Sequence, residues 1–346
     1  MNTQKRTKFI INIVILLAVF AIIIYLVQNS LAEILQELTT TNPLILLAII
    51  LLGLANLFFD GWLIKEIVSS FSRKFRIFDG VLTTWYVAFY RVITFGAGTL
   101  VSEVNFYNRK DLKVSQGMGV TSLHMIMHKA AILTYGIIAF ILQFSLIYTH
   151  APNSIPFILL GMLMTLAIIL FFLVISLSTN LQVIFIIICN RLFKKAKFRE
   201  VIDRVNLQIY SLRETVSTVL QDRTALIRVY LLSMIKLALW YIIPFICLMD
   251  GQNEIDFLLI FSLVSFTLVL SGVIPSPAGI GAFEFVYLYL FTPVVGTVDA
   301  VSSLLLYRFA SYLLPFILGF VQFMIERKRV ISNELEELKT EKELSQ

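Results

Sequence analysis

The sequence predicts an all-α protein that crosses a membrane several times. Hydrophobic residues make up 58% of the 346 residues and charged residues only 14%, against about 45–50% and about 25% in soluble domains. The mean hydropathy is +0.87. Apolar runs of about 20 residues, the length of a membrane-spanning helix, recur along the chain. The net charge of +6 is typical of basic cytoplasmic loops and does not indicate nucleic-acid binding.

Six apolar runs are long and regular enough to be full spans. The first follows Lys5, Arg6 and Lys8. It is too long for the core of a signal peptide and no small-residue cleavage site follows it, so an uncleaved first span is expected. Glycine, proline or charge interrupts two further stretches, 81–101 and 257–291. The six predicted spans are 9–27, 44–64, 120–148, 156–178, 229–249 and 300–325.

The loop charges predict the orientation of these spans, because Lys and Arg collect on the cytoplasmic side. The N-terminus, loop 65–80, segment 190–228 and the C-terminal end are basic and are therefore placed inside. Loops 28–43 and 250–256 are acidic and are placed outside. Loop 105–116 is also basic, so 81–101 would enter and leave on the cytoplasmic side.

By the same reasoning, 257–291 would begin and end outside. The prediction is six full spans plus two re-entrant helical hairpins that enter from opposite faces. Eight full spans remain the alternative. Both chain termini are then cytoplasmic, in a multi-pass protein of the cytoplasmic membrane.

One membrane domain is expected over residues 1–330. Its first half, 9–178, and its second half, 229–325, are joined by segment 191–225. Apolar residues in this linker recur at near-helical spacing between charged ones, which indicates amphipathic helices on the membrane surface; a solvated connector is the alternative. Residues 331–346 form a charged cytoplasmic tail, which is expected to fray from a helix end.

The second interrupted stretch contains the most unusual motif. It reads S-P-A-G-I-G-A-F-E over residues 276–284. Non-helical backbone at membrane depth persists only where protein covers it or where it lines a cavity, and an ionisable residue there indicates a functional site. We therefore expect a broken helix that lines a cavity and binds substrate, with Pro275, Pro277, Gly279, Gly281 and Glu284.

The first interrupted stretch contains a similar motif, A-G-T-L-V-S-E over residues 97–103. In each stretch Ala-Gly is followed after four residues by Glu, and a basic residue lies in a later span. Opposed hairpins that share a motif suggest inverted repeats with a binding site at their interface, as in many transporters.

We predict a role for each charged residue in the two motifs and for the nearby basic residues. Glu103 and Glu284 would accept hydrogen bonds from lipid hydroxyl or ammonium groups, while Lys129, Arg308 and Arg91 would bind phosphate. Alternatively, Glu284–Arg308 and Glu103–Lys129 are buried pairs that only fix the fold.

Other polar residues in the apolar runs carry weaker signals. His124 and His128 have the i, i+4 spacing of metal ligands, but no third ligand is evident, so a proton relay or lipid contact is preferred. Lys236 is expected to reach back to the membrane surface, and Asp60 to be interfacial. No metal, cofactor, nucleophile elbow or P-loop is expected.

Several of these segments resemble a known family. P-S-P-A-G-I-G-A-F-E at 275–284, Arg308 in L-Y-R-F-A-S-Y, and Pro315 and Gly319 in L-P-F-I-L-G are similar to lysylphosphatidylglycerol synthase transmembrane (flippase-like) domains. The resemblance covers about residues 8–328. Near the first hairpin, Phe95-Gly96-Ala97-Gly98 lacks a proline that the family often has.

The resemblance implies lipid translocation. In two-domain members, the membrane domain is thought to move aminoacylated phosphatidylglycerol to the outer leaflet, and a soluble domain transfers lysine from lysyl-tRNA. This chain ends soon after the last apolar run, so a stand-alone membrane domain is expected. The cargo would be aminoacylated phosphatidylglycerol, a glycolipid or a polyprenyl-linked lipid.

Three alternatives remain open. They are a head-group enzyme of the phosphatidylglycerol lysyltransferase type, a transporter of small ions or solutes, and a partner subunit of a lipid transferase. The expected partners are membrane lipids, with a lipid-modifying transferase or a second copy of the chain as further candidates.

Overall fold

The computed structural model describes residues 33–150, 155–177, 196–220, 222–249, 255–274 and 281–344, with isolated positions between 184 and 191. These residues form helices and connecting turns, and no strand occurs among them. Within these ranges, four single helices are long and apolar enough to cross a membrane, namely α2 (Pro43–Ser69), α5 (Val114–His150), α6 (Ile155–Leu177) and α9 (Arg223–Leu248). A fifth crossing combines α12 (Thr297–Arg308), the π-helix η3 (Phe309–Leu313) and the first part of α13 (Leu314–Leu344).

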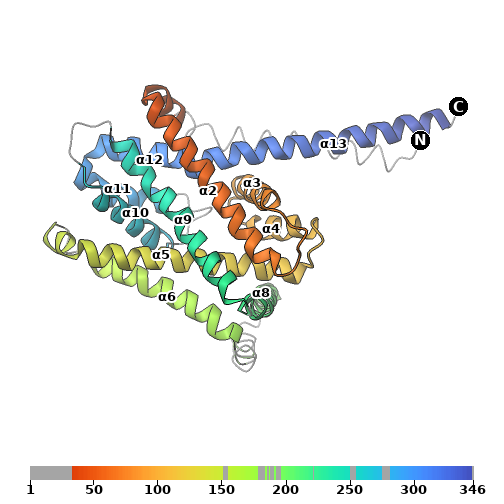
Figure 1. Cartoon of the computed structure of the whole chain (residues 1–346), viewed down its shortest axis with the longest axis horizontal. Helices are drawn as coiled ribbons and strands as arrows, with labels where there is room; N and C mark the ends of the chain where they lie inside the picture. Colours follow the sequence, from red (N-terminus) through yellow and green to blue (C-terminus); the bar gives the residue numbers. More distant parts are fainter. Residues whose placement is uncertain are drawn as a thin grey trace.

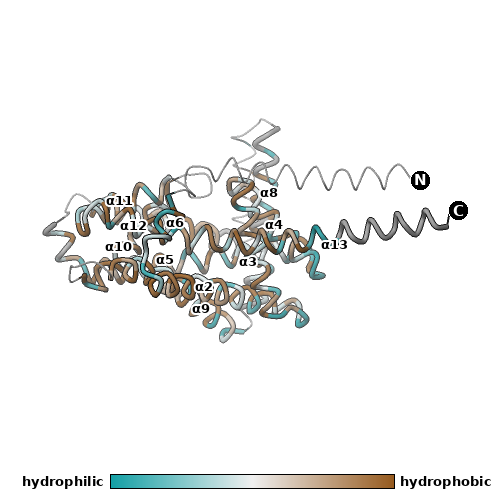
Figure 2. Tube along the Cα trace, turned by 90° about the horizontal axis from the view of Figure 1, so that it is seen from above, coloured by the Kyte–Doolittle hydropathy of each residue, from teal (hydrophilic) through white to brown (hydrophobic). Residues whose placement is uncertain are grey.

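The predicted fold class, an all-α multi-pass membrane protein, is therefore confirmed (Figure 1). The five crossings correspond to five of the six predicted spans; the span predicted at 9–27 lies outside the described residues. Figure 2 shows hydrophobic residues along most of the bundle and hydrophilic ones near the exposed part of α13.

Several helices begin at side chains that cap their free N–H groups. The Asp222 carboxylate accepts hydrogen bonds from the N–H groups of Thr224 and Ala225 at the start of α9. Asn42 caps α2 in the same way, directly before Pro43. Such caps contribute about 0.5–2 kcal/mol each, and proline suits the first helical position. The starts of α2 and α9 are thus encoded locally.

Helices α2 and α9 pack antiparallel across the middle of the bundle (Figure 1). The amide nitrogen of Asn56 donates to the carbonyl oxygen of Lys236 at 2.6 Å. Further along, Arg228 near the start of α9 pairs with Glu66 near the end of α2 at 3.0 Å. The end of α2 therefore lies beside the start of α9.

The segment predicted to turn back at 81–101 is a helical hairpin. It consists of α3 (Ile77–Ile93) and α4 (Thr99–Asn108), joined by a turn in which Phe95 and Gly96 have φ values of 51° and 83°. The two ends of the hairpin lie side by side, because Lys110 pairs with Asp79 at 2.6 Å. This hairpin opens at the end of the bundle where α2 ends.

A second hairpin consists of α10 (Phe257–Ser271) and α11 (Ala282–Val295), which pack together. Helix α10 runs back along α9, since the rings of Tyr241 and Phe261 lie 5.0 Å apart. Helix α12 then folds back on α11 after Gly296, with Tyr287 and Ser303 joined by a 3.0 Å hydrogen bond. This hairpin opens at the other end of the bundle, where α9 ends.

The two hairpins thus open in opposite directions, and each one packs against helices of both halves of the chain. Helix α3 of the first hairpin packs on α13, and helix α10 of the second packs on α5. Within each half, α4 packs on α5 and α11 packs on α12. Inverted repeats would produce this arrangement; the repeat relationship and the depth of each hairpin in the membrane stay predictions.

The structure of the linker excludes one predicted alternative, and the tail is more helical than predicted. Helix α8 (Ala196–Leu220) packs on α5 and α6, with Ser211 and Thr215 buried. The linker is therefore a helix docked on the bundle and not a solvated connector. The tail does not fray at 331, because α13 continues to Leu344 and projects beyond the bundle (Figure 1).

Two glycines allow α2 and α3 to touch. A Cβ atom on Gly80 would lie 2.0 Å from the carbonyl oxygen of Gly61, so no larger residue fits without separating the helices. We predict that Gly80→Ala lowers the free energy of unfolding by about 1–3 kcal/mol, the usual cost of overpacking. Thermal unfolding of the purified protein measures this. Gly117→Ala is the control, because its Cβ would meet nothing closer than 3.4 Å; equal melting temperatures would contradict the prediction.

The hairpin topology predicts which loops share a membrane face. In a chain whose Cys189 and Cys247 are replaced by serine, the exposed positions Lys74 and Lys113 are each changed to cysteine. We predict that an impermeant thiol reagent labels both from the same side. Val298, which is 80% exposed at the start of α12, is changed to cysteine in the same background and should be labelled from the opposite side. Labelling of Lys74→Cys and Lys113→Cys from different sides would instead support eight full spans.

Candidate functional site

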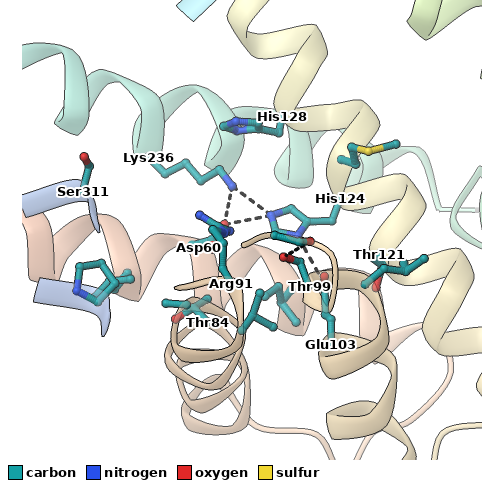
Figure 3. A pocket seen from close by; sticks show the side chains of 18 of the residues that line it. Asp60, Thr84, Arg91, Thr99, Glu103, Thr121, His124, His128, Lys236 and Ser311 are labelled. Carbon is teal, nitrogen blue, oxygen red and sulfur yellow. Dashed lines mark hydrogen bonds and ion pairs between the residues drawn. The ribbon is translucent and has the colours of Figure 1, made fainter. Parts of the chain in front are cut away.

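A cavity of about 460 Å³ lies inside the bundle. Its lining comes from α2, α3, α4, α5, α9 and the segment around η3 (Figure 3). Its size falls in the range of ligand pockets, roughly 300–1,000 Å³. Its polar lining consists of Asn56, Asp60, Thr84, Arg91, Thr99, Glu103, Thr121, Ser122, His124, His128, Lys236, Ser311 and Tyr312.

The tip of the first hairpin forms one wall of this cavity. Gly96 and Ala97 of the turn line it, as do Thr99 and Leu100 at the start of α4. The turn is held by Thr94, whose hydroxyl accepts from the Gly98 N–H at 2.9 Å. Because the first N–H groups of a helix lack partners within it, the N-terminus of α4 provides hydrogen-bond donors beside the cavity.

Three ionisable side chains from three helices meet at the cavity. Lys236 of α9 donates to the Asp60 carboxylate of α2. His124 of α5 contacts both, with its Nε2 atom 2.9 Å from Asp60 Oδ1 and 3.0 Å from Lys236 Nζ. Only 6% of the Lys236 side chain is exposed. The predictions that Lys236 reaches the surface and that Asp60 is interfacial are wrong, because the two side chains neutralise each other inside the bundle.

Glu103 also lies in the cavity, but the prediction that it pairs with Lys129 is wrong. Its Oε1 atom accepts from the Tyr107 hydroxyl at 2.8 Å and lies 3.7 Å from Nδ1 of His124. Lys129 instead donates to the carbonyl oxygen of Gly272, at the end of α10, at 3.3 Å. Lys129 is five residues beyond His124, which places it on a different face of α5. Arg91 lines the cavity as well.

The other predicted pair is brought together at the second hairpin. Arg308 Nη2 lies 2.6 Å from Glu284 Oε1, and Glu284 Oε2 accepts from the Gly281 N–H at 2.7 Å, which caps α11. The Arg308 guanidinium stacks 4.5 Å from the Phe283 ring and 5.9 Å from the Tyr312 ring. Since Tyr312 lines the cavity, this pair lies next to it.

The remaining predicted residues of the second motif are not placed. Pro275, Pro277 and Gly279 lie outside the described residues. Gly281 is described, and its φ of 89° lies in the region that favours glycine. Among the described residues, no group of three or more His, Cys, Asp or Glu side chains is arranged to hold a metal ion.

The cluster of Asp60, His124 and Lys236 is the part of the site that sequence reasoning missed. Each residue was noted separately, but 176 positions separate Asp60 from Lys236. One signal in the sequence could have revealed the cluster. All three residues lie within predicted spans, where an ionisable side chain indicates a functional site and needs a partner of opposite charge.

Comparison with known proteins identifies the family of the chain. No protein of curated function matches the chain. The family model described as "Lysylphosphatidylglycerol synthase TM region" matches residues 10–319, and this range includes every residue that lines the cavity. The chain therefore belongs to the lysylphosphatidylglycerol synthase TM region family, and it is a multi-pass membrane protein with a lipid-related function.

Proposed function

We propose that the protein translocates a phospholipid or a lipid-linked molecule between the leaflets of the cytoplasmic membrane. The observation that carries this proposal is a polar cavity that reaches the apolar side of the bundle. A head group would enter the cavity while its acyl chains stay in the bilayer. The expected cargo is aminoacylated phosphatidylglycerol, a glycolipid or a polyprenyl-linked lipid.

The exposed residues around the cavity support a lateral opening. Ala97 and Met125 line the cavity and are also exposed. Their neighbours Phe95 and Val101 are apolar and 50% and 67% exposed. Acyl chains favour such an apolar rim, whereas a path for a small hydrated ion does not need one. The rim therefore favours a lipid over a soluble cargo.

The cavity lining suits a phosphate-bearing head group. Arg91 and Lys236 supply positive charge, and Arg can bind phosphate through two parallel hydrogen bonds. The hydroxyl oxygens of Thr121 and Ser122 are buried without a hydrogen-bond partner among the described residues, so they are free to bind a head group or water. The N-terminus of α4 adds N–H groups of the kind that bind anions.

The carboxylates suit the other end of an aminoacylated head group. Glu103 lies in the same cavity as Arg91, so an ammonium group and a phosphate group could be bound together. In this proposal Glu284 and Arg308 form a second contact, next to Tyr312, for a head group that leaves towards the opposite hairpin.

Translocation by this chain would need no nucleotide. The sequence contains no P-loop motif, and downhill or ion-coupled movement requires none. In the proposed orientation both termini are cytoplasmic, so the first hairpin faces the cytoplasm and the second faces outward.

A liposome assay tests the proposal. The purified protein is reconstituted with a fluorescent phosphatidylglycerol, and an impermeant quencher reports how fast the label moves between leaflets. We predict faster movement than in protein-free liposomes. Arg91→Ala should slow it about tenfold or more, because a hydrogen bond to a charged group contributes about 1.5–3 kcal/mol.

The matched control is Arg73→Ala. Arg73 is exposed and lies outside the cavity lining, so this variant should retain the full rate. Equal rates with wild-type protein and with empty liposomes would contradict the proposed function. Equal rates for Arg91→Ala and Arg73→Ala would contradict the assignment of the cavity.

A further inference from the structure

His124 is positioned between two carboxylates in the cavity (Figure 3). Its Nε2 atom lies 2.9 Å from Asp60 Oδ1, and its Nδ1 atom lies 3.7 Å from Glu103 Oε1. The same Nε2 atom lies 3.0 Å from Nζ of Lys236. Each ring nitrogen therefore faces a group that would accept a proton from it.

These contacts permit a change of protonation state without movement of the helices. A neutral imidazole carries one N–H. Its Nε2 atom either accepts from Lys236, with Nδ1–H directed to Glu103, or donates to Asp60. Only the imidazolium form directs an N–H group towards each of the two carboxylates at once. The cluster thus has a place for one additional proton.

The charged groups around His124 determine what an additional proton does. Those facing the cavity are Asp60 of α2, Arg91 of α3, Glu103 of α4 and Lys236 of α9. Two carboxylates and two cations sum to zero when His124 is neutral and to one positive charge when it is protonated. The remaining titratable groups nearby are Tyr107, His128 and Tyr312. The apolar helices α6 and α10, which pack on α5, carry no charged residue. Helix α8 also packs on α5 and does carry charged residues, but none of them lines the cavity, and Lys129 of α5 is directed to Gly272.

An excess charge inside an apolar bundle is unfavourable unless it is paired. One extra proton without an anion leaves the cavity positive, and one phosphodiester without a proton leaves it negative. When both bind, the charges cancel. Proton binding and head-group binding therefore favour each other. This count applies to a head group whose only charge is the phosphodiester; an aminoacylated head group brings its own ammonium group and needs no added proton.

We propose that the Asp60–His124–Lys236 cluster takes up one proton from solution together with one phosphodiester head group of net negative charge, such as that of phosphatidylglycerol, so that translocation of such a lipid is coupled to proton movement. This inference rests on the proposed function and adds the coupling ion to it. The proton is held on the His124 imidazole, between Asp60 and Glu103, and returns to solution when the head group leaves.

The coupling predicts in which direction head-group affinity changes with pH. Because the complex holds more protons than the empty protein, head-group affinity rises as the pH falls. The coupling is reciprocal, so the factor by which protonation tightens head-group binding equals the factor by which the head group tightens proton binding. For one proton the slope is at most about tenfold per pH unit.

Proton uptake on binding tests the proposal directly. The full chain in uncharged detergent is placed in weakly buffered solution with a pH indicator, and short-chain phosphatidylglycerol is added. Fluorescence of Trp240, which lines the cavity, reports binding. We expect up to one proton taken up per lipid bound, and none with short-chain phosphatidylcholine, whose net charge is zero. Saturable phosphatidylglycerol binding without proton uptake would overturn the proposal.

A second arm identifies the source of the phosphodiester. Dimethyl phosphate has the same charge but no acyl chains. Weak or absent uptake with dimethyl phosphate supports a lipid head group as the ligand. Equal uptake at equal concentration would overturn the lipid assignment and indicate a site for free anions.

Two histidine variants separate proton coupling from folding. His124→Gln stays polar but cannot carry the proton, so proton uptake and the pH slope should both be lost. His150→Gln is the matched control, because His150 is the last residue of α5 and is not among the residues that line the cavity, so this variant should keep the uptake. Undiminished uptake in His124→Gln would contradict the proposal. If His124→Gln does not fold, the wild-type uptake measurement decides.

Different outcomes contradict the proton coupling and the proposed lipid translocation. Lipid movement in liposomes that is independent of pH contradicts proton coupling but not translocation. Proton-coupled binding without lipid movement contradicts translocation but not the proton site.

Discussion

The ammonium group of Lys236, buried in an apolar bundle, is the constraint on which the centre of this structure depends. An unpaired charge there would cost several kcal/mol, so the carboxylate of Asp60 has to lie against it. His124 completes the contact from α5. Three helices that are distant in sequence are thereby held at fixed positions around one polar centre, and the cavity lies beside it.

The two opposed hairpins explain why this centre can be reached from outside the bundle. In the first hairpin, the chain turns at Phe95 and Gly96 and restarts as α4 at Thr99. That restart brings a helix N-terminus and Glu103 to the cavity. In the second hairpin, Glu284 caps α11 and pairs with Arg308. Both hairpins thus bring ionisable groups towards the middle of the bundle, from opposite ends.

The fold was largely predictable from sequence, whereas the polar centre was not. Spans and hairpin openings depend on local features, namely apolar length and loop charge, so 44–64 and 81–101 were recognised. The pairing of Asp60 with Lys236 depends on how α2 packs on α9, which no local pattern encodes. Glu103 was assigned to Lys129 because sequence spacing was compared without the helical phase of α5, which turns His124 towards it.

The central claim is that a lipid head group enters the cavity, and photo-crosslinking tests this most directly. A phospholipid with a photoreactive group on its head group is irradiated with the reconstituted protein, and the adducts are mapped by mass spectrometry. We predict adducts on cavity-lining residues such as Thr84, Thr121 and Ser122, which excess unlabelled lipid suppresses. Adducts confined to outward-facing residues such as Ile141 and Leu163 would contradict the account.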